Sequence, residues 1–428
     1  MSEEILGSVS VKDIAKKLNK AYKNNVLATS DLIPECERFS MGSLSADYAT
    51  YGGLPLGNLI VFSGESQSGK SVFAARCMAE YQKSHPDKIC IYADAEGNLP
   101  AQLSWFEEIT GLDTSPERFM RYDCAGKAAE DIFDDLWMLQ RADDIGMIIL
   151  DSAPALISKI DLEKPISEDN GMRASVAKTL GKFCKFMLVG LAKAGNPMII
   201  INHVRVTGKT HQGAKIYEEP CGFALDYYPA MKIRFAPRKF TKGENLEVSF
   251  SQRDNTIDGF CVIFSVTKNR LGLTDRTGAK VIFRTKATDE FDVGVDTLTD
   301  LIEIITKYDI APKLNNTTRR LVNPLTGETL YDKETKKPLE LAGRPKLIAY
   351  LKSHPEFTKE YEKMVSAYLN RTKKKISLID EEDLAKILEV ENAIQEENNK
   401  KRKKRENTVV EPAPETEGDP EFEEVEMP

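Results

Sequence analysis

An octapeptide at residues 64–71 carries the residue types that bind a triphosphate. It reads GESQSGKS, fits the pattern G-x-x-x-x-G-K-[ST], follows an apolar run and precedes a helix-like pattern. Glycines let backbone N–H groups face phosphate oxygens at a helix start, the lysine reaches the outer phosphates, and the final hydroxyl binds Mg²⁺. We expect ATP and Mg²⁺ as ligands, with nucleotide bound by Gly64, Glu65, Ser66, Gln67, Ser68, Gly69, Lys70 and Ser71. Lys70 is also a candidate catalytic residue, and Ser71 is a candidate metal ligand.

Acidic residues follow two further apolar runs. Residues 147–152 read MIILDS, which places Asp151 at the carboxyl end of an expected central strand, beside the nucleotide and its metal. Residues 88–96 read KICIYADAE and end with Asp94 and Glu96. Alternation along a strand puts these two carboxylates on the same face, so either one could polarise the water that attacks the γ-phosphate. An ordinary solvated strand end is the competing explanation for this pair.

A polar pair ends a fourth apolar run. Residues 198–203 read MIIINH, so Asn202 and His203 lie where a strand beside the nucleotide would end. A side chain at this place could detect the γ-phosphate and pass its presence to the loop that follows. A purely structural role for His203 is the competing hypothesis.

The apolar runs must be strands that bring these groups together. They are short, apolar on both faces and separated by helical stretches such as 70–85 and 172–194, which is typical of a parallel sheet covered by helices. Between 230 and 286 the pattern changes to alternating strands (MKIRFAP, NLEVSFS, CVIFSVT, KVIFRT), which indicates an antiparallel extension of the same sheet. The predicted fold class is α/β, a P-loop core with a mixed, mainly parallel sheet, a short N-terminal helical segment and a small helical C-terminal domain.

Composition divides the chain into four parts. Residues 1–40 contain an amphipathic helix at 3–25 and are assigned to oligomerisation, and residues 41–288 form the ATPase core. Residues 289–392 form a C-terminal α/β accessory domain, mostly helical, with the turn-rich insert NPLTGETLYDKETKKP. Residues 393–428 are low in apolar content, carry KKRKKR at 400–405 and are expected to be a disordered charged tail. No internal repeat is visible.

Charge and cysteine content limit the function classes. The net charge of −8 at first argues against a nucleic-acid partner, but residues 406–428 hold nine acidic residues and no Lys or Arg, and the rest of the chain is close to neutral. Seven cysteines without a C-x-x-C pair indicate a reducing compartment and no structural zinc. No apolar run reaches the roughly 20 residues of a membrane span, and no signal-peptide pattern opens the chain. We expect a cytoplasmic protein with no membrane partner.

The order of these motifs resembles the RecA family of recombinases, in its bacterial form or its phage-encoded UvsX form. FSMGSLSADYATYGGLPLGNLIVFSGESQSGKS resembles the entry into the family's core, and DAE, DSAPALISK and INH follow in order. GFALDYYPAMKIRF is similar to the segment after the second DNA-binding loop, VTKNR at 266–270 to the basic finger, and GRPKLIAYLKSHPEFTKEYEKMV at 343–365 to the helical C-terminal domain of bacterial RecA. The resemblance covers roughly residues 30–370 and implies a RecA-like core at 41–288.

The resemblance assigns roles to the acidic residues by position. It implies that Glu96, rather than Asp94, is the catalytic carboxylate that activates water, and that Asp151 is a ligand near Mg²⁺. His203 occupies the place of the γ-phosphate sensor, which is usually glutamine. Histidine can still donate one hydrogen bond there, whereas the side-chain amide of glutamine offers two groups, an NH₂ donor and a carbonyl acceptor.

The resemblance also implies an active site shared between copies of the chain. Lys268 and Arg270 match a pair of cations that reach the ATP of a neighbouring protomer and stabilise transition-state charge. This arrangement implies a helical homo-oligomeric filament. The family stacks adenine on an aromatic residue seven positions after the catalytic carboxylate, where this chain has Leu103 and, two residues later, Trp105.

Two loops are expected to face single-stranded DNA. The first, 158–172, leads into a helix with basic side chains, Lys182 among them, and the second, 204–222, combines basic residues with several glycines. Cations for phosphates, a flexible backbone and an occasional inserted side chain suit sequence-independent binding, and an ordinary surface loop is the competing explanation. The candidate DNA-binding residues are Met172, Arg173, Lys178, Lys185, Arg205, Lys209, Lys215, Tyr217 and Gly222. By resemblance, Met172 is an apolar wedge between bases.

The leading hypothesis is a DNA-dependent ATPase that forms a filament on single-stranded DNA and catalyses homologous pairing and strand exchange with double-stranded DNA in recombination and repair of DNA damage. Single-strand-binding or loader proteins are expected as further partners. The alternatives are a hexameric RecA-fold DNA helicase and a non-catalytic, nucleotide-gated scaffold. The helical segment 343–365 and the lack of a sizeable N-terminal helical collar speak against the helicase. The acidic tail is expected to compete with DNA for basic surfaces.

Overall fold

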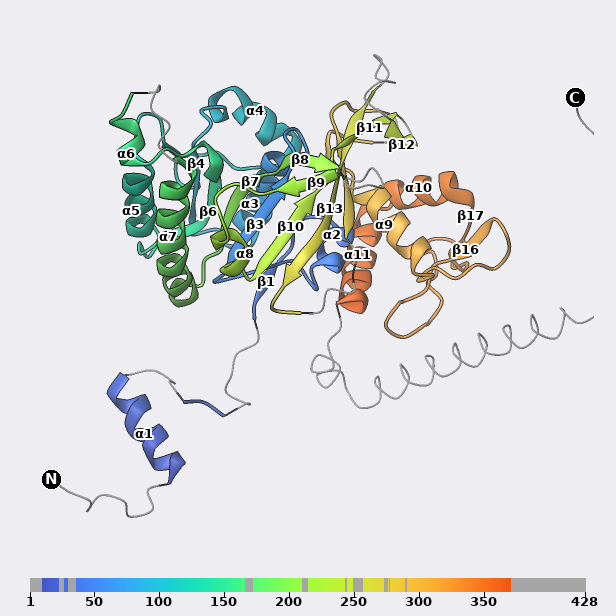
Figure 1. The fold of residues 1–428 in the computed structure, drawn as a ribbon. Helices are drawn as coiled ribbons and strands as arrows, with labels where there is room; N and C mark the ends of the chain where they lie inside the picture. Colours follow the sequence, from blue (N-terminus) through green and yellow to red (C-terminus); the bar gives the residue numbers. More distant parts are fainter. Residues whose placement is uncertain are drawn as a thin grey trace, which may run out of the picture. The chain divides into compact units, whose positions relative to one another are not determined.

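The computed structural model describes most of the chain between residues 10 and 370 (Figure 1). The described residues are 10–22, 27–29, 36–165, 172–209, 215–242, 245–248, 257–272, 276, 278–288 and 291–370. The predicted charged tail lies outside these residues, as do residues 166–171 of the first predicted DNA-binding loop and 210–214 of the second. The chain divides into two compact units, Met1–Ile304 with Ile348–Ser353, and Ile305–Leu347 with His354–Pro428. The four predicted domains stay a prediction.

A sheet of 11 strands forms the centre of the first unit. Its parallel part runs in the order β5-β4-β6-β7-β3-β10, so the strands that end in Gly64, Asp94, Asp151 and His203 lie side by side. The bounds are β3 Leu59–Gly64, β4 Ile89–Asp94, β5 Phe119–Asp123, β6 Ile145–Asp151, β7 Met198–His203 and β10 Met231–Phe235. Because parallel strands end at the same edge, the sheet gathers these residues along one edge.

An antiparallel part continues the sheet beyond β10. Its central strand β13 pairs with β10, β11 and β14. The bounds are β11 Lys239–Lys242, β12 Asn245–Val248, β13 Gly259–Asn269, β14 Ala279–Arg284 and β15 Gly294–Val295. The predicted mixed sheet is confirmed. MKIRFAP forms the junction strand β10, which is antiparallel to β13, as expected for the extension, and parallel to β3 on its other side. The local pattern of a strand does not reveal the direction of its neighbour.

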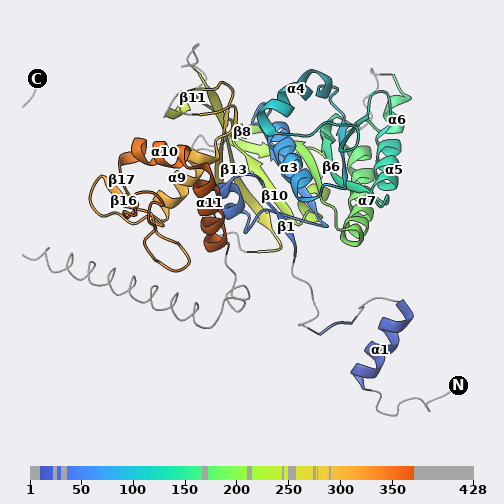
Figure 2. The ribbon, with the colours of Figure 1, turned by 180° about the vertical axis from the view of Figure 1, so that it is seen from behind.

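Helices cover both faces of the sheet. Because side chains alternate between the two faces along a strand, successive residues of one strand contact helices on opposite faces. In β3, Ile60 and Phe62 pack in the cluster of α3 and α4, whereas Leu59 and Val61 pack in the cluster of α5 and α7. The bounds are α3 Lys70–Ser84, α4 Leu99–Thr110, α5 Ala129–Leu139 and α7 Met172–Ala194. Figure 1 shows α7 in front of the sheet, and Figure 2 shows α3 in front of the opposite face. Burial on both faces explains the continuous apolar runs.

A buried arginine joins the antiparallel strands to the segment that follows them. Arg284 is fully buried and donates hydrogen bonds to Asp258 (Nη1 to Oδ1, 3.0 Å) and Asp296 (Nε to Oδ2, 2.9 Å). Its guanidinium carbon lies 3.9 Å from the ring centre of Phe291. A cation buried this deeply is tolerated because both carboxylates are in place.

Short elements complete the first unit. Their bounds are α1 Val11–Tyr22, β1 Arg38–Phe39, α2 Leu44–Ala49, β2 Leu54–Pro55, a 3₁₀ turn Ala153–Ala155, α6 Lys159–Leu162, β8 Arg205–Lys209, β9 Lys215–Glu218 and α8 Ala224–Tyr227. Helix α9, Thr297–Lys307, begins in the first unit and ends in the second. Helix α1 is the described part of the helix predicted at 3–25, and none of its residues is buried. In the described part of the chain, no helix combines the length and apolar character needed to cross a bilayer.

The second unit contains a repeat that the sequence pattern does not reveal. Leu321, Leu330 and Leu339 are spaced nine residues apart, and their backbones form a ring of hydrogen bonds: Leu330 N–H to Leu321 O (3.0 Å), Leu339 N–H to Leu330 O (2.9 Å) and Leu321 N–H to Leu339 O (2.9 Å). Each interval holds a turn with positive φ, at Gly327 in one and Lys336 in the other. No repeat is visible in the sequence at this place, because the intervals VNPLTGET and YDKETKKP share backbone form and hardly any residues.

The remaining described elements are two more strands and two helices. Their bounds are β16 Thr318–Arg320, β17 Glu340–Ala342, α10 Gly343–Ser353 and α11 Pro355–Leu369. Strands β16 and β17 pair antiparallel. The two helices lie where GRPKLIAYLKSHPEFTKEYEKMV predicts helical structure.

Candidate active site and nucleic-acid groove

The loop between β3 and α3 has the backbone form that a phosphate cradle needs. Gly64 ends β3, and a Cβ there would lie 2.8 Å from the carbonyl oxygen of Phe235. Gly69 has a φ of +91°, and a Cβ there would lie 2.6 Å from Val262 Cγ2. Side chains at these positions would push the loop out of shape, so the geometry requires both glycines of the motif. The loop fits a nucleotide phosphate at the start of α3.

Lys70, the first residue of α3, is buried inside this loop. Its Nζ donates hydrogen bonds to the carbonyl oxygens of Gly64 (3.1 Å) and Glu65 (2.8 Å) and lies 3.4 Å from Ser68 Oγ. Burial lowers the pKa of Lys70 to about 8, and carboxylates on the neighbouring strands oppose part of this effect. A buried ammonium with neutral partners gains from an approaching anion, so Lys70 fits a phosphate group.

Asp151 ends β6 beside this loop and is almost fully buried. Its Oδ2 accepts a hydrogen bond from the Tyr92 hydroxyl (2.6 Å), and the peptide bond between Asp151 and Ser152 is cis. Burial raises the pKa of Asp151, whereas hydrogen bonds from Ser71 and Tyr92 lower it. A carboxylate and a hydroxyl side by side are oxygen donors of the kind that Mg²⁺ prefers, so Ser71 and Asp151 fit a magnesium ion.

Glu96 lies just beyond β4 and is bound by side chains from two neighbouring strand ends. Its Oε1 accepts a hydrogen bond from Ser152 Oγ (2.7 Å) and lies 2.8 Å from His203 Nε2. The hydrogen bond with His203 is the main cause that lowers the pKa of Glu96 to about 2, and the bond from Ser152 acts in the same direction. Glu96 is therefore a carboxylate at every pH near neutrality.

Asp94 has different hydrogen-bond partners from Glu96, so the two carboxylates of the DAE segment do not lie in one site. Its Oδ2 accepts hydrogen bonds from Arg121 (2.8 Å to Nη2) and from the N–H of Leu99 (3.2 Å). Its Oδ1 accepts one from the N–H of Asn98 (3.2 Å). The predicted alternation fails because β4 ends at Asp94, before Glu96. Asp94 thus holds the start of α4 and the neighbouring strand β5.

Lys268 lies near the end of β13 and Arg270 directly follows that strand, and both donate hydrogen bonds to α8 of the same chain. Lys268 Nζ donates to the carbonyl oxygens of Tyr227 (2.9 Å) and Asp226, and Arg270 Nη2 donates to that of Tyr227. Burial, followed by the charge of Arg270, lowers the pKa of Lys268. Their hydrogen-bond partners within the described residues are thus main-chain oxygens, and a role toward a neighbouring protomer stays a prediction.

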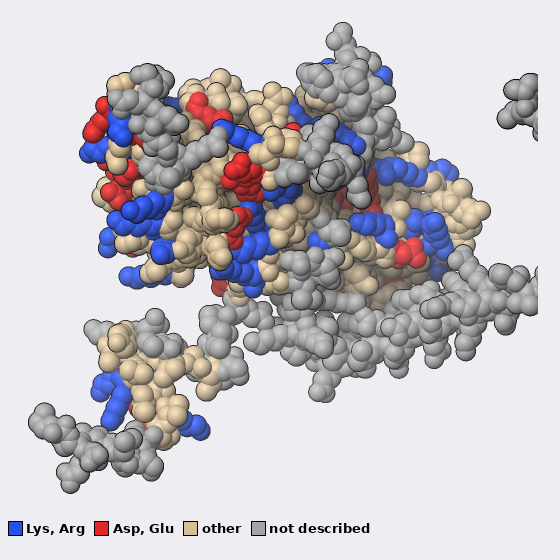
Figure 3. All heavy atoms as spheres, viewed as in Figure 1, with Lys and Arg blue, Asp and Glu red and all other residues tan. Residues whose placement is uncertain are grey.

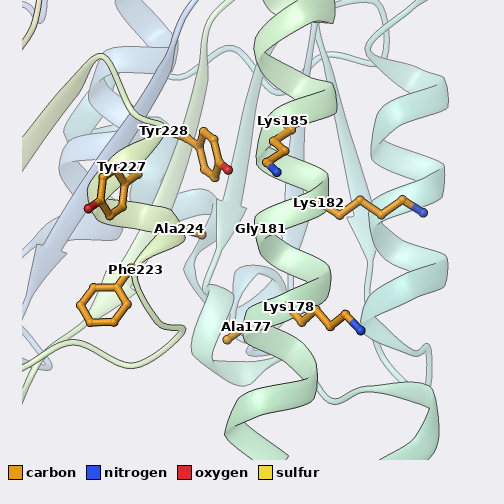
Figure 4. A pocket seen from close by; sticks show the side chains of 9 residues that line it. All are labelled: Ala177, Lys178, Gly181, Lys182, Lys185, Phe223, Ala224, Tyr227 and Tyr228. Carbon is orange, nitrogen blue, oxygen red and sulfur yellow. The ribbon is translucent and has the colours of Figure 1, made fainter.

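A groove lined by basic and aromatic residues lies between α7 and the segment around α8. In Figure 4, Lys185 lies beside Tyr228, whereas the side chains of Lys178 and Lys182 extend away from the rings. Its volume is about 400 Å³, and its lining residues are Ala177, Lys178, Gly181, Lys182, Lys185, Phe223, Ala224, Tyr227 and Tyr228. The lysines follow one another at helical spacings on α7, and the rings come from the facing segment. Phe223 and Tyr227 are 79% and 67% exposed. Figure 3 shows a group of basic side chains over α7.

The three rings of this groove are absent from the residues predicted for DNA binding. Phe223, Tyr227 and Tyr228 stand within the segment GFALDYY, and this density of aromatic residues beside a basic helix is the signal that could have found them. The predicted Lys178 and Lys185 do line the groove. Met172 and Arg173 lie in the first turn of α7, where the structure describes only the backbone.

The second predicted DNA-binding loop is partly a β-ribbon. Strands β8 and β9 pair antiparallel, with Arg205 opposite Glu218 and Val206 opposite Tyr217. The candidates Lys209 and Lys215 face each other across the ribbon and are described by their backbone only. Gly222 follows with a φ of +68°, and a Cβ there would lie 3.2 Å from Ala177 of α7.

Leu103 and Trp105 on α4 both pack against the core of the first unit. The ring of Trp105 lies 6.0 Å from that of Phe260, centre to centre, in a stacked arrangement. A contact of either residue with adenine stays a prediction.

Comparison with known proteins identifies the family. A model of the RecA N-terminal domain matches residues 8–257, more than half of the chain. Protein RecA of Mycoplasma mycoides is 26% identical over 319 residues, covering 72% of this chain and 82% of its own length. Protein RecA of Malacoplasma penetrans is 24% identical over 382 residues, covering 87% of this chain and 99% of its own length. A crystal structure of the RadB recombinase aligns with a TM-score of 0.39 and 18% identity, over 58% of this chain and 96% of that one. The chain belongs to the RecA family.

Proposed function

We propose that this chain is a DNA-dependent ATPase that forms a filament on single-stranded DNA and catalyses homologous pairing and strand exchange in recombination and repair. Proteins of the RecA family are DNA-dependent ATPases that bind ATP with Mg²⁺ and act in recombination and repair. The observation that carries the proposal is the ionised Glu96, bonded to His203 at the strand end from which the β8–β9 ribbon departs. This bond links a candidate catalytic group to the strand end that leads into a candidate DNA-binding element.

In the proposed reaction, the loop at 64–71 holds the phosphates of ATP. The glycines allow the backbone to approach them, and Lys70 exchanges its carbonyl partners for phosphate oxygens. Ser71 and Asp151 would hold Mg²⁺, which neutralises phosphate charge when bound. Glu96 orients and polarises the attacking water. A carboxylate whose pKa is about 2 is a weak base, so it positions the water more than it holds the proton.

His203 is proposed to report the state of the nucleotide to the DNA-binding ribbon. It shares a hydrogen bond with Glu96, and Val204 alone separates it from the first residue of β8, Arg205. A γ-phosphate that interacts with either Glu96 or His203 changes the position of the other side chain. The ribbon then moves with the strand end that carries it.

Single-stranded DNA is proposed to bind in the groove between α7 and α8. Lys178 and Lys185 supply cations for backbone phosphates, and the exposed rings of Phe223 and Tyr227 supply stacking platforms for bases. Both features are independent of base sequence, as a filament that coats any strand requires.

Self-association is proposed to use α1 of a neighbouring copy as the docking segment. Helix α1 carries Lys12, Lys16, Lys17 and Lys20 beside exposed apolar residues. A groove of about 290 Å³ between α5 and α7 offers the complement, with aromatic rings and two acids among its lining residues: Glu130, Phe133, Asp134, Trp137, Thr179, Lys182, Phe183 and Phe186. Basic and acidic residues at the borders of matching apolar surfaces favour one orientation of such a contact. Lys268 and Arg270 would then act on the neighbour's ATP.

The proposal is tested by measuring ATP hydrolysis with and without single-stranded DNA, together with strand exchange on homologous and heterologous duplexes. We expect DNA to stimulate hydrolysis, and exchange with the homologous duplex only. Electron microscopy with an ATP analogue and single-stranded DNA separates the filament from a hexameric helicase. Closed six-membered rings, or equal exchange with the heterologous duplex, would overturn the proposal.

A further inference from the structure

Tyr217 of the β8–β9 ribbon touches the phosphate loop directly. Its hydroxyl donates a hydrogen bond to Glu65 Oε1 over 2.9 Å, although the two residues are far apart in the sequence. Glu65 is the first residue after Gly64 in the loop, and its carbonyl oxygen accepts the hydrogen bond from Lys70 Nζ. One residue of the phosphate loop is thus bonded to the DNA-binding ribbon through its side chain and to the catalytic lysine through its backbone.

A second contact fixes the base of the same ribbon to the central sheet. Glu219 pairs with Lys232 (2.8 Å) and with Arg234, both on β10. Asn202 Nδ2 at the end of β7 adds a hydrogen bond to Glu219 (3.3 Å). The guanidinium of Arg234 also lies 5.6 Å from the ring centre of Tyr217. The ribbon is therefore anchored at Glu219, and Tyr217, two residues away, reaches from that anchor to the phosphate loop.

We infer that Tyr217 is a positioning residue whose hydroxyl couples the phosphate loop to DNA binding, separately from the Glu96–His203 pair. This inference rests on the proposed function. Binding of a triphosphate places several negative charges beside Glu65 and takes Lys70 away from the Glu65 carbonyl, so both the backbone and the carboxylate of this residue respond to the nucleotide. The hydrogen bond carries that response to β9. Coupling of this kind is reciprocal, so DNA on the ribbon strengthens nucleotide binding by the same factor.

The geometry favours this role over base stacking, which is the other way in which Tyr217 could serve as a DNA-binding residue. Stacking uses the ring face, which here lies near Arg234, whereas the hydroxyl is directed at Glu65. The two roles depend on different atoms. Replacement of Tyr217 by phenylalanine keeps the ring that a base would need and removes only the hydroxyl.

The test measures binding of a fluorescent oligothymidine to wild type and to Tyr217→Phe, each with and without Mg²⁺ and a non-hydrolysable ATP analogue. The coupling factor is the ratio of the two dissociation constants. We expect Tyr217→Phe to reduce this factor about three- to tenfold, the range for a partly exposed hydrogen bond to a carboxylate. In a Glu65→Ala background the same substitution should have no further effect, because the two residues act through one bond. Tyr331→Phe, an exposed tyrosine of the second unit, is the matched control and should leave the factor unchanged.

The outcomes separate this inference from the proposed function. A wild type whose DNA affinity does not respond to the nucleotide overturns both. A wild type that responds, together with a Tyr217→Phe variant that responds equally, overturns the inference alone. An additive loss in the Glu65→Ala, Tyr217→Phe double variant also overturns it, because the two side chains would then act independently.

Discussion

Replacing Glu96 by glutamine tests the catalytic site most sharply. The substitution keeps the size of the side chain and an acceptor for Ser152 Oγ (2.7 Å), and it removes the negative charge that His203 Nε2 stabilises at 2.8 Å. Groups that activate or position water contribute about 10²–10⁴-fold to rate. Because the pKa of Glu96 is about 2, it is a weak base, and we expect the lower part of that range. A loss of about 10²–10³-fold corresponds to about 2.7–4 kcal/mol in the activation free energy.

The assay is steady-state ATP hydrolysis at saturating single-stranded DNA, with fluorescent-nucleotide binding measured in parallel. Nucleotide affinity should change by less than about threefold, because Glu96 is expected to stabilise the transition state more than the bound ground state. Glu117→Gln, an exposed carboxylate in the loop before β5, is the matched control and should hydrolyse ATP at the wild-type rate. Turnover by Glu96→Gln within about threefold of wild type would refute the assignment of Glu96 to the reaction.

A second arm tests the cause of the low pKa. Ser152→Ala removes one hydrogen-bond donor, so the pKa of Glu96 should rise toward its ordinary value. In the proposed mechanism the ionised form is the active one and is lost as pH falls through the pKa, so the acid limb of the rate profile should lie at higher pH in the variant. The stability of the fold depends on pH in the same direction. The depressed pKa stabilises the fold above the ordinary value near 4.5, and that contribution is lost as pH falls toward about 2. Superimposable acid limbs would contradict this account.

Three further predictions concern stability, nucleotide binding and DNA binding. Arg284→Met leaves two buried aspartates without their cation and should lower the free energy of unfolding in urea by about 3–5 kcal/mol. Arg320→Met, which removes a partly exposed ion pair with Glu340, should lower it by less than about 1 kcal/mol, and equal effects would contradict the prediction. Because burial lowers the pKa of Lys70 to about 8, its charge is lost as pH rises, so ATP should bind more weakly at pH 9 than at pH 7 in a fluorescence titration, and Lys70→Met should abolish this difference. Replacing Lys178 and Lys185 together by alanine should reduce the slope of log affinity against log salt for single-stranded DNA by about 1.4; an unchanged slope would remove both from the DNA contact.

Local sequence predicts those parts of the site in which one short segment contains the functional residues and also determines their geometry. GESQSGKS specifies a strand end, a glycine turn and a helix start within eight residues, and the structure has all three. Apolar runs similarly predict strands buried on both faces. The place of β10 between a parallel neighbour, β3, and an antiparallel neighbour, β13, could not be obtained this way, because its own residues suit either kind of neighbour equally.

Other parts of the site depend on contacts between distant segments. The choice between Asp94 and Glu96 depends on where β4 ends and on Arg121, which no spacing rule connects to the DAE segment. The bond between Tyr217 and Glu65 crosses most of the core sequence. Such pairings become visible only when the sheet order places the segments side by side.

The ring of leucines in the second unit also provides a place at which a label can be inserted. Leu321, Leu330 and Leu339 close each interval with their own backbone bonds, and the turn tips at Gly327 and Lys336 are exposed. Residues added at a tip lengthen one interval without moving the leucines that frame it. A short labelling peptide at Lys336 should therefore leave the chain folded and carry a fluorophore or gold particle. Copies of the protein in the proposed filament could then be counted along a strand of DNA.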